Sequence, residues 1–381
     1  MKPLSFSLLH TDASGARAGV LHTRRGEVPT PVFMPVATHA GFRHHGVDEV
    51  KAVGAKVLLS NTYHLLLRPG RDVFEKLGGI HRFMGWDGAV LTDSGGFQIF
   101  SLPNERKLTE KGAHFVNPVD NHRHLLSPET SIAMQQAIGS DIMMVLDVCI
   151  DSRSKEPETR DAMERTHRWA LRSLAARDAR ETGQALFAIV QGGTFQALRT
   201  ESAQFLTPHP FDGFAIGGLA VGEPREQLYA MTAHTARLLP AGKPRYLMGV
   251  GTPIDLVESV HNGVDMFDCI LPTKMSQQGY AYTFNGLVSA WKREYRLSNA
   301  PLEEGCDCET CTRFTMGYVQ HQVAGSHALG VRLLGVHNLR HYQRLMARMR
   351  QAIVEGRFEA EYQWLRERLA PRSKAEAKLA G

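Results

Sequence analysis

This sequence of 381 residues lacks any run of apolar residues long enough to cross a bilayer. It also lacks a secretory signal, because residues 1–10 contain no basic segment followed by an apolar core and a small-residue cleavage site. We therefore expect a cytoplasmic protein with no membrane partner. Hydrophobic residues make up 43% of the chain and charged residues 22%, which predicts a globular protein with one large core or two smaller ones.

Cysteine is also scarce, and the five cysteines are Cys149, Cys269, Cys306, Cys308 and Cys311. An odd number, with three of them inside six positions, does not resemble a disulfide framework, and a reducing cytosol disfavours one.

The clustered cysteines predict a metal site instead. The candidate ligands are Cys306, Cys308, Cys311 and His337. Three thiolates and one imidazole satisfy tetrahedral Zn²⁺, and a closed set of four ligands is typical of a structural site. His321 and His327 are nearby alternatives for the fourth ligand. Such a site would fix the segment around it to the C-terminal helix.

A net charge of +5 favours a polyanionic partner only weakly, because many basic proteins never contact nucleic acid. Basic residues gather late in the chain, at Lys292, Arg293, Arg296, Arg332, Arg340, Arg344, Arg348 and Arg350. They could form a phosphate-binding surface or simply a solvated face, and the sequence alone leaves both open.

Short apolar runs recur from residue 31 onward, without the alternation of half-exposed strands. They occupy 32–36, 56–60, 89–93, 142–147, 186–191, 214–218, 246–250 and 266–271. Amphipathic helical patterns lie between most of them, at 156–183, 195–206, 224–239 and 253–261, and another begins at Ser127. Eight buried strands alternating with helices predict an α/β fold, a (β/α)₈ barrel over residues 31–279. An open doubly wound sheet is the alternative, but no G-x-G-x-x-G follows the first strand.

Three segments lie outside this regular alternation. Residues 1–30 read as an antiparallel cap with a hairpin turn near Asp12 to Gly15. A long polar stretch, 97–126, follows the third strand. Residues 280–381 follow the eighth strand and form the predicted zinc-binding subdomain, which ends in a basic helix at about 339–369.

Polar or glycine residues end nearly every predicted strand, namely Asn61, Asp93, Asp147, Gln191, Gly217, Gly218, Gly249 and Asp268. In a barrel these strand ends surround one cavity, where catalytic groups gather. Polar residues end most strands anyway, so no single position is diagnostic. Three aspartates and a glutamine together predict a site.

Two of these carboxylates suit glycosidic chemistry. Asp93 lies in TDSGGFQ, where Gly95 and Gly96 allow close approach of the backbone to a ligand and Phe97 offers a stacking face. Asp268 lies within an otherwise apolar strand, where a carboxylate is unfavourable unless it is paired or used. One carboxylate can attack the sugar carbon while the other handles the proton of the leaving group. Structural ion pairing is the alternative role for either.

Asp147 and Gln191 suit the edge of a purine. A carboxylate accepts from a ring N–H and an exocyclic amine, whereas an amide both donates and accepts. The backbone of Gly217, Gly218 and Leu219 would add further donors and acceptors. Alternatively, Gln191 could have no role beyond ending its strand.

Several sequence blocks are distinctive in the identity of their residues as well as in their spacing. They are SNTYHLLLRPG, FMGWDGAVLTDSGGFQIFSL, IVQGG, AIGGLAVGE, YLMGVGTPIDLVESV, DMFDCILPT and CDCETC…GVHNL. In order and over nearly the whole chain, they closely resemble the bacterial tRNA-guanine transglycosylases of the queuosine pathway, the queuine tRNA-ribosyltransferase family.

The resemblance implies a role for each matching residue. It implies that Asp268 is the nucleophile at the ribose C1′ of the wobble guanosine, that Asp93 is the general acid/base, and that a structural Zn²⁺ is bound by the four candidate ligands. The implied base-binding residues are Ser94, Phe97, Asp147, Gln191, Gly218, Leu219 and Met248. The implied tRNA-binding residues are Gly249, Val250, Gly251, Thr252, Pro253, Ile254, Asp255, Thr273, Lys274, Met275, Ser276 and Gln277.

The resemblance also implies a reaction and partners. Guanine leaves GUN-anticodon tRNAs (those for Asp, Asn, His and Tyr), a covalent aspartyl-ribose intermediate remains, and 7-aminomethyl-7-deazaguanine (preQ1) replaces the base with configuration retained. The target base must first leave its stack. Bulk at Cys149 and Val221 resembles the bacterial pattern that excludes queuine. A homodimer is implied, and no ATP or redox cofactor.

Two positions depart from the family pattern. The familiar D-E-C-T reads Asp147-Val148-Cys149-Ile150, and the arginine-rich stretch after LPT reads KMSQQ at 274–278. Arginine forks bind phosphates or base edges in pairs of hydrogen bonds, whereas lysine is a point charge and glutamine carries none. The family's recognition of the bases beside the wobble position therefore does not transfer directly to this chain.

Two other functions compete with this reading. A barrel glycosidase or nucleoside hydrolase would use its zinc in catalysis, which a closed set of four ligands disfavours. A non-catalytic subunit that only binds RNA would not need both Asp93 and Asp268.

Overall fold

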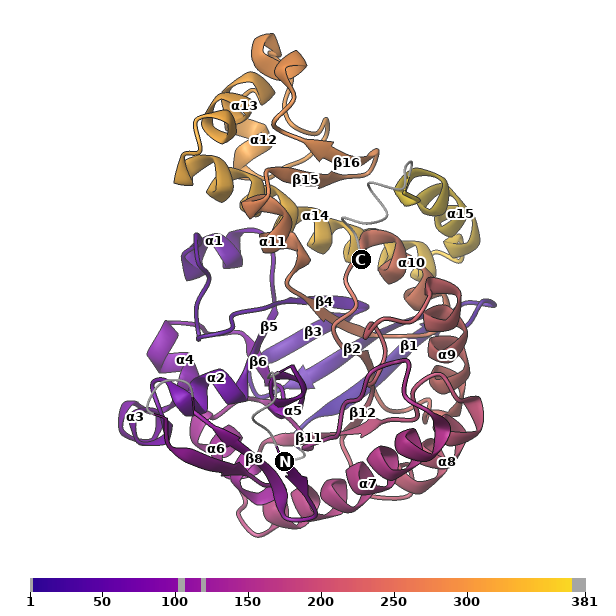
Figure 1. The fold of residues 1–381 in the computed structure, drawn as a ribbon. Coiled ribbons are helices and arrows are strands. Elements are labelled where there is room, and N and C mark those ends of the chain that lie inside the picture. The colour runs from indigo at the N-terminus through magenta and orange to yellow at the C-terminus, as the bar shows by residue number, and fades with distance from the viewer. Residues whose placement is uncertain (1–2, 102–106, 118–120, 372–381) are drawn as a thin grey trace.

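The computed structural model describes residues 3–101, 107–117 and 121–371. Its centre is a sheet of eight parallel strands, seen end-on in Figure 1. Along the sheet the strands are β4 (Val32–Pro35), β14 (Met266–Cys269), β13 (Arg245–Leu247), β12 (Gly213–Ile216), β11 (Ala185–Val190), β10 (Ile142–Met144), β6 (Ala89–Thr92) and β5 (Val57–Ser60). A parallel bridge between Val36 and Leu59 joins the two ends of this order. The predicted barrel is thus confirmed, and the alternative of an open sheet is not.

Helices surround the barrel (Figure 1). They are α1 (Val47–Ala52), α2 (Thr62–Leu67), α3 (Arg71–Leu77), α4 (Gly79–Met84), α6 (Pro128–Ile138), α7 (Glu156–Asp178), α8 (Gln196–Leu206), α9 (Arg225–Leu238), α10 (Pro253–His261) and α11 (Leu271–Gln277). Local sequence explains several starts: the Ser127 hydroxyl accepts from the Thr130 N–H before α6, and the Thr252 hydroxyl accepts from the Asp255 N–H before α10. The predicted helices correspond to α7–α10, although α7 ends at Asp178 rather than at residue 183.

One seam of the barrel wall is completed by a side chain. Strands β6 and β10 pair only at Leu91 and Ile142. Beside this pair the buried amide of Gln135, from α6, donates to the Met144 carbonyl at 2.9 Å and accepts from the Met144 N–H at 2.8 Å. The same amide oxygen accepts from the Thr92 hydroxyl at 3.0 Å. Gln135 therefore takes the place of a strand partner between two strands that lead into the site.

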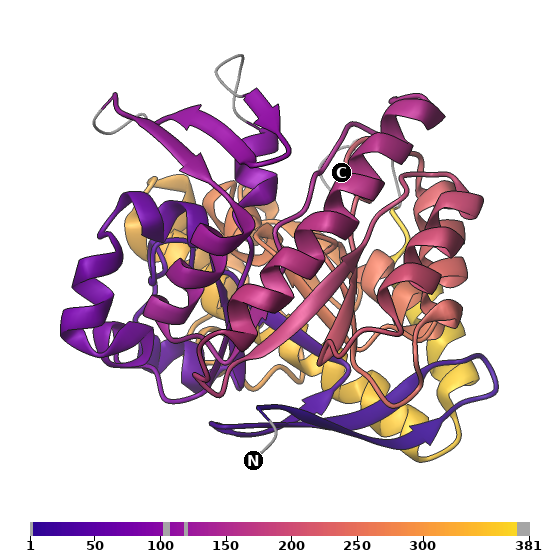
Figure 2. The same ribbon diagram turned by 90° about the horizontal axis from the view of Figure 1, so that it is seen from below.

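An antiparallel sheet of β1 (Ser5–Thr11), β2 (Arg17–Thr23) and β3 (Gly26–Thr30) lies beneath the barrel in Figure 2. The predicted hairpin is present, and a third strand extends it. Arg17 ties this sheet to the barrel through two hydrogen bonds to the carboxylate of Asp265, at 2.9 and 3.1 Å, just before β14 begins. The sheet therefore covers the amino ends of the barrel strands.

The polar stretch after the third barrel strand contains a second small sheet. After α5 (Gly96–Phe100), strands β7 (Lys107–Thr109), β8 (Gly112–Val116) and β9 (Arg123–Leu126) pair antiparallel. Figure 2 places this sheet at the opposite end of the barrel from β1–β3. The sequence predicted only a polar insertion here, and its residues 102–106 and 118–120 lie outside the described residues.

The C-terminal segment contains β15 (Tyr280–Thr283), β16 (Gly286–Ser289), the 3₁₀ helix η1 (Arg293–Leu297), α12 (Glu309–Arg313), α13 (Met316–Ala324), α14 (Ala328–Val354) and α15 (Phe358–Leu369). The prediction of one basic helix at 339–369 is wrong in two respects. The helix begins at Ala328, and it is interrupted near Gly356, whose φ of 68° lies in the left-handed region. The predicted domain boundaries at residues 30 and 279 stay predictions, and residues 372–381 lie outside the described residues.

Within the described part of the chain, no helix has both the length and the apolar composition needed to span a membrane.

Candidate active site

A cavity of about 610 Å³ opens where the barrel strands end. Asp93, Asp147 and Asp268, which come from three different strand ends, all line it. The structure therefore brings the three predicted carboxylates to one place, as expected for a barrel.

Asp93 directly follows β6 and is held by three donors. Its Oδ1 accepts from the Thr62 N–H at 2.7 Å, and its Oδ2 accepts from the amides of Asn61 and Gln98 at 2.6 and 2.9 Å. Burial raises the pKa of Asp93 to about 6, although the three hydrogen bonds oppose that change. A carboxyl group with a pKa near 6 can both accept and release a proton near neutral pH.

Asp268 is the third residue of β14 and is held through a single oxygen. The Tyr246 hydroxyl donates to Oδ1 at 2.5 Å, and the Gly249 N–H donates to the same oxygen at 2.8 Å. Within the described residues, Oδ2 has no hydrogen-bond partner. Burial raises the pKa of Asp268, and both hydrogen bonds oppose the rise.

Asp93 and Asp268 are electrostatically coupled, because the charge of Asp268 contributes to the raised pKa of Asp93. No salt bridge to either carboxylate occurs in the described part of the chain. The alternative of structural ion pairing therefore loses its basis. Two carboxylates across one cavity can instead divide attack and proton transfer at a sugar carbon.

Asp147 is buried, and its two oxygens have different partners. The Ser94 hydroxyl donates to Oδ1 at 3.0 Å, and the Gln191 amide donates to Oδ2 at 2.8 Å. Gln191 does not itself line the cavity but supports Asp147 from the side. Burial raises the pKa of Asp147. Gly96 must be glycine here, because a Cβ at that position would lie 2.6 Å from Oδ1 of Asp147.

The remaining predicted base-binding residues form the walls. Phe97 is 53% exposed at the rim, while Met248, Gly218 and Leu219 line the cavity from the loops after β12 and β13. A flat ring entering between Phe97 and Met248 would meet aromatic and thioether groups, both of which favour contact with π-systems.

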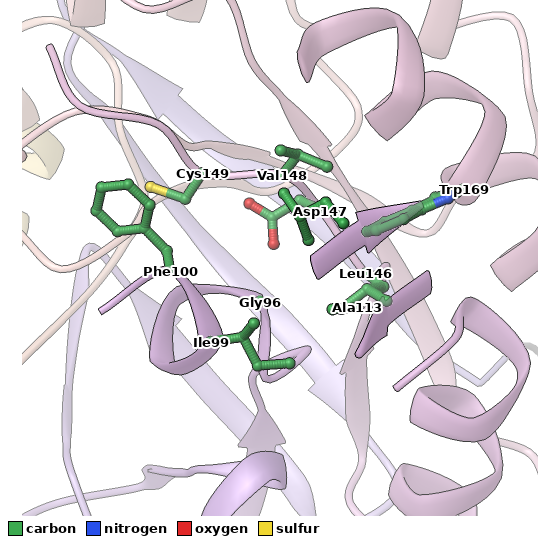
Figure 3. Close-up of a pocket in the computed structure, with 10 residues that line it drawn as sticks. Gly96, Ile99, Phe100, Ala113, Leu146, Asp147, Val148, Cys149 and Trp169 are labelled. Atoms are coloured by element: carbon green, nitrogen blue, oxygen red, sulfur yellow. The ribbon is translucent and has the colours of Figure 1, made fainter. Parts of the chain in front are cut away.

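A narrow apolar pocket adjoins the cavity and shares Asp147 and Cys149 with it. Figure 3 shows the Asp147 carboxylate above Gly96, with Phe100 beside Cys149 and Trp169 on the far side. The apolar side chains around Asp147 account for the burial that raises its pKa.

The predicted tRNA-binding residues fall into accessible and buried groups. Gly249, Lys274 and Gln277 are exposed, and Thr273 is partly exposed. The buried members are Val250, Gly251, Thr252, Pro253, Ile254, Asp255, Met275 and Ser276. Residues 250–252 lead into α10, for which Thr252 is the cap, and 253–255 form its first turn. Met275 and Ser276 belong to α11, which packs on α14. Direct contact with RNA stays a prediction for all of these residues, and the accessible ones are free to make it.

The sequence did not reveal two groups that hold the carboxylates of Asp93 and Asp268. Tyr246 and Gln98 each donate to one of them. Tyr246 begins the apolar run YLMGV, where a tyrosine reads as a core residue. Gln98 lies five residues after Asp93, so the motif TDSGGFQ contained the signal.

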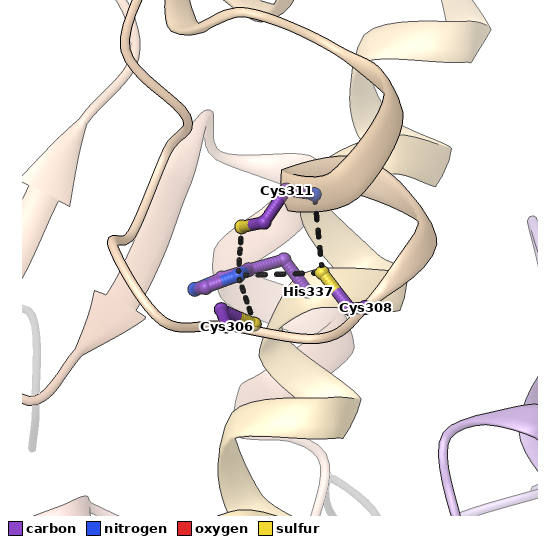
Figure 4. A group of neighbouring side chains, drawn as sticks. All are labelled: Cys306, Cys308, Cys311 and His337. Carbon is purple, nitrogen blue, oxygen red and sulfur yellow. Dashed lines mark hydrogen bonds between the residues drawn. The ribbon is translucent and has the colours of Figure 1, made fainter.

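Cys306, Cys308, Cys311 and His337 converge between α12 and α14 (Figure 4). The His337 Nδ1 lies 3.6, 3.7 and 3.3 Å from the three sulfur atoms in that order. Zn–S and Zn–N bonds of about 2.3 and 2.0 Å in a tetrahedron separate sulfur from nitrogen by roughly 3.5 Å. The other ring nitrogen, Nε2, faces the Tyr282 carbonyl at 2.8 Å, an arrangement that orients a metal-bound histidine.

These four residues could hold a metal ion. His337, rather than the alternatives His321 or His327, completes the group. His327 instead contacts Gln322 through Nδ1 at 3.0 Å.

Most of the late basic residues are engaged with the protein itself. Arg340 pairs with Asp307, Arg344 with Glu303, and Arg348 with Glu361. Arg332 contacts Glu49 and Glu309, and Arg350 donates to the carbonyls of residues 29 and 31. These arginines attach α14 to its surroundings, so they do not form a free phosphate-binding surface.

Comparison with known proteins gives one consistent result. A model of the family described as queuine tRNA-ribosyltransferase matches residues 12–371. The queuine tRNA-ribosyltransferase of Thiobacillus denitrificans is 49% identical over 355 residues, which are 93% of this chain and 96% of that protein. The family member of Symbiobacterium thermophilum is 49% identical over 94% of this chain and 89% of its own length. The family member of Vibrio atlanticus is 46% identical over 93% of this chain and 94% of its own length. This chain therefore belongs to the queuine tRNA-ribosyltransferase family, the tRNA-guanine transglycosylases.

Proposed function

We propose that this enzyme exchanges the wobble guanine of GUN-anticodon tRNAs for preQ1, through a covalent aspartyl-ribose intermediate, in queuosine synthesis. The observation that carries the proposal is the pair of carboxylates, Asp93 and Asp268, that line one cavity and have different sets of hydrogen-bond donors.

The first half of the reaction breaks the bond between C1′ and N9 of guanine. Asp268 attacks C1′ through Oδ2, because its Oδ1 is already held by Tyr246 and Gly249. Asp93 gives its proton to the departing base, for which a pKa of about 6 suits it. An ester between Asp268 and the ribose remains.

The second half reverses the proton transfer. The incoming 7-deazaguanine loses its ring N–H proton to Asp93 while its nitrogen attacks C1′, and the Asp268 carboxylate is released. Two inversions at C1′ retain the configuration. No net proton or electron is gained, so neither ATP nor a redox cofactor is required.

Asp147 would accept from the ring N–H and the exocyclic amine of the base, and the Gly218 backbone would donate to its oxo group. Ser94 and Gln191 hold Asp147 ready for this contact. Phe97 and Met248 would enclose the two faces of the ring. Leu219 closes the same side of the cavity.

The choice of preQ1 rests on the space beside the seventh position of the base. Cys149 and Val221 line the cavity. We expect their bulk to admit an aminomethyl group and to exclude the ring of queuine. We also propose that the tRNAs are those for Asp, Asn, His and Tyr. Their wobble base must flip out to reach a cavity of this depth.

We further propose a cytoplasmic homodimer in which the Cys₃His group holds a structural Zn²⁺. Four protein ligands leave no open coordination position, so the ion would stabilise the C-terminal segment and take no part in the reaction. His337 and Asn338 are neighbours on α14, and Asn338 donates to the Pro272 carbonyl at 2.9 Å. The ion would thereby support α11, which carries Lys274.

The deciding experiment incubates the enzyme with unmodified tRNA and, separately, labelled guanine, preQ1 and queuine. We expect incorporation of guanine and preQ1 without net loss of base, and a tRNA adduct that survives denaturation. Release of guanine without replacement would indicate a hydrolase instead. Incorporation of queuine at the rate of preQ1 would refute the assignment of the substrate.

A further inference from the structure

Arg199 is a buried arginine that none of the groups above accounts for. It lies in the first turn of α8, and its side chain is fully buried. In the described part of the chain it has no salt bridge, and its Nη1 has no hydrogen-bond partner. Burial of a guanidinium without a salt bridge is unfavourable, and it lowers the pKa of Arg199 to about 10, although the charge of Glu223 opposes this change. Such a position calls for a reason beyond packing.

The hydrogen bonds of Arg199 join two loops. Its Nε donates to the Gly193 carbonyl, after β11, at 2.7 Å. Its Nη2 donates to the Gly217 carbonyl, after β12, at 3.0 Å, with the Gly218 carbonyl at 3.5 Å. Because the guanidinium is a rigid planar fork, these bonds fix the two loops relative to each other.

The loop after β12 lines the proposed base pocket, and the loop after β11 supports it. Gln191 lies at the end of β11, and Gly218 lies after β12 with a φ of 65°. A Cβ on Gly218 would lie 2.2 Å from Oε1 of Gln191, so the two loops are in direct contact. Since Gln191 also holds Asp147, a displacement of Gly218 would reach the carboxylate that recognises the base.

The contact at Gly217 has an electronic consequence as well. The Gly217 carbonyl and the Gly218 N–H belong to the same peptide group. Across the described residues, that N–H has no hydrogen-bond acceptor, and Gly218 lines the cavity. A cation bound at the carbonyl end polarises the peptide, and it therefore makes the N–H a stronger donor in a site of low dielectric.

We propose that Arg199 is a positioning residue that holds the Gly217–Gly218 peptide and strengthens its N–H as donor to the oxo group of the bound purine. The inference rests on the proposed function. As the C1′–N9 bond breaks, negative charge spreads over the departing base and its oxo group. A donor that is already oriented stabilises this charge more in the transition state than in the ground state.

Arg245 provides a matched control. It is also largely buried, with a pKa lowered to about 10 by burial, and it also donates to loop carbonyls, those of Leu239 and Gly263. It begins β13, however, at the amino end of the barrel. A purely structural arginine should behave as Arg245 does.

The experiment compares Arg199→Met, Arg199→Lys and Arg245→Met in exchange of labelled guanine into tRNA, with the melting temperature of each. We expect Arg199→Met to raise the KM for guanine and to slow adduct formation, each about tenfold, as for loss of a charge-assisted hydrogen bond. Arg199→Lys should restore part of the affinity for guanine and part of the rate of adduct formation. Arg245→Met should lower only the melting temperature.

A second readout uses inhibition by guanine and by 2-aminopurine, which lacks the oxo group and the adjacent ring N–H, so that the effect of each variant is compared within one base. Arg199→Lys should weaken inhibition by guanine and leave that by 2-aminopurine unchanged. Equal losses for the two bases, or wild-type constants in Arg199→Lys, would overturn the inference even if Arg199→Met does not fold. An inactive wild-type enzyme would instead overturn the proposed function.

Discussion

The Tyr246 hydroxyl lies 2.5 Å from Oδ1 of Asp268, the same oxygen that accepts from the Gly249 N–H. Two donors on one oxygen orient the carboxylate and direct its other oxygen toward the cavity. The geometry thus separates the oxygen that is held from the oxygen proposed to react.

Replacing Tyr246 with phenylalanine should slow formation of the covalent adduct about tenfold, because the carboxylate loses an orienting hydrogen bond worth about 1 to 2 kcal/mol. Single-turnover adduct formation measures the effect. Tyr229→Phe is the matched control, since Tyr229 donates to Asp255 at 2.6 Å through a similar pair outside the cavity. Equal slowing in both variants would contradict a specific role for Tyr246.

Asp268→Asn should abolish both exchange and the adduct that survives denaturation, because an amide is not a nucleophile toward C1′. Binding of free guanine should persist, since Asp147 and Gly218 are untouched. Denaturing electrophoresis with labelled tRNA detects the adduct. Full activity in this variant would exclude Asp268 as the attacking group.

Asp93 should impose a pH dependence on both rate and stability. Its folded-state pKa of about 6 lies above the ordinary value of 3.8, so the folded protein holds this proton more tightly than the unfolded chain does. The ionised carboxylate therefore destabilises the fold above about pH 6, by about 3 kcal/mol at most, and this penalty disappears as the pH falls toward 3.8.

Melting temperatures of wild type and Asp93→Asn should therefore diverge between pH 4 and 7, in favour of the variant, which should also lose exchange. Attack of the incoming base on the adduct should slow below about pH 6, where Asp93 is protonated. Asp265→Asn serves as the control, because burial raises the pKa of Asp265 to about 6 as well, but at the far end of the barrel. If Asp265→Asn altered the pH dependence of the rate and Asp93→Asn did not, the assignment of Asp93 as the proton-transfer group would be refuted.

Cys308→Ser should lower metal content and thermal stability together, because the metal group joins α12 to α14. Metal analysis and thermal denaturation measure the two properties. Cys269→Ser should keep its metal, since Cys269 lies at the cavity and outside the group. Unchanged stability in metal-free protein would rule out a structural role.

The sequence predicted the barrel well because its strands are buried on both faces, and a strand such as β11 (Ala185–Val190) is apolar throughout. It predicted Asp93, Asp147 and Asp268 as one site because the carboxyl ends of barrel strands meet. The strands β7–β9 were not predictable in this way: they are short and partly exposed, so they carry no apolar pattern.

Arg199 and Gln135 escaped prediction for a different reason. Each side chain binds backbone carbonyls that become neighbours only after the barrel closes. No motif marks such a residue, because backbone partners have no side-chain identity. The end of α14 near Gly356 was missed because the basic and apolar pattern continues into α15.

The amide of Gln135 completes the wall between the strands that lead to Asp93 and Asp147. At this seam, the two strands are joined by the Gln135 amide and by the single pair Leu91–Ile142. Asparagine would shorten the side-chain spacer by one carbon–carbon bond, about 1.5 Å. The strand ends that carry Asp93 and Asp147 would then lose one tie, although no residue that lines the cavity changes.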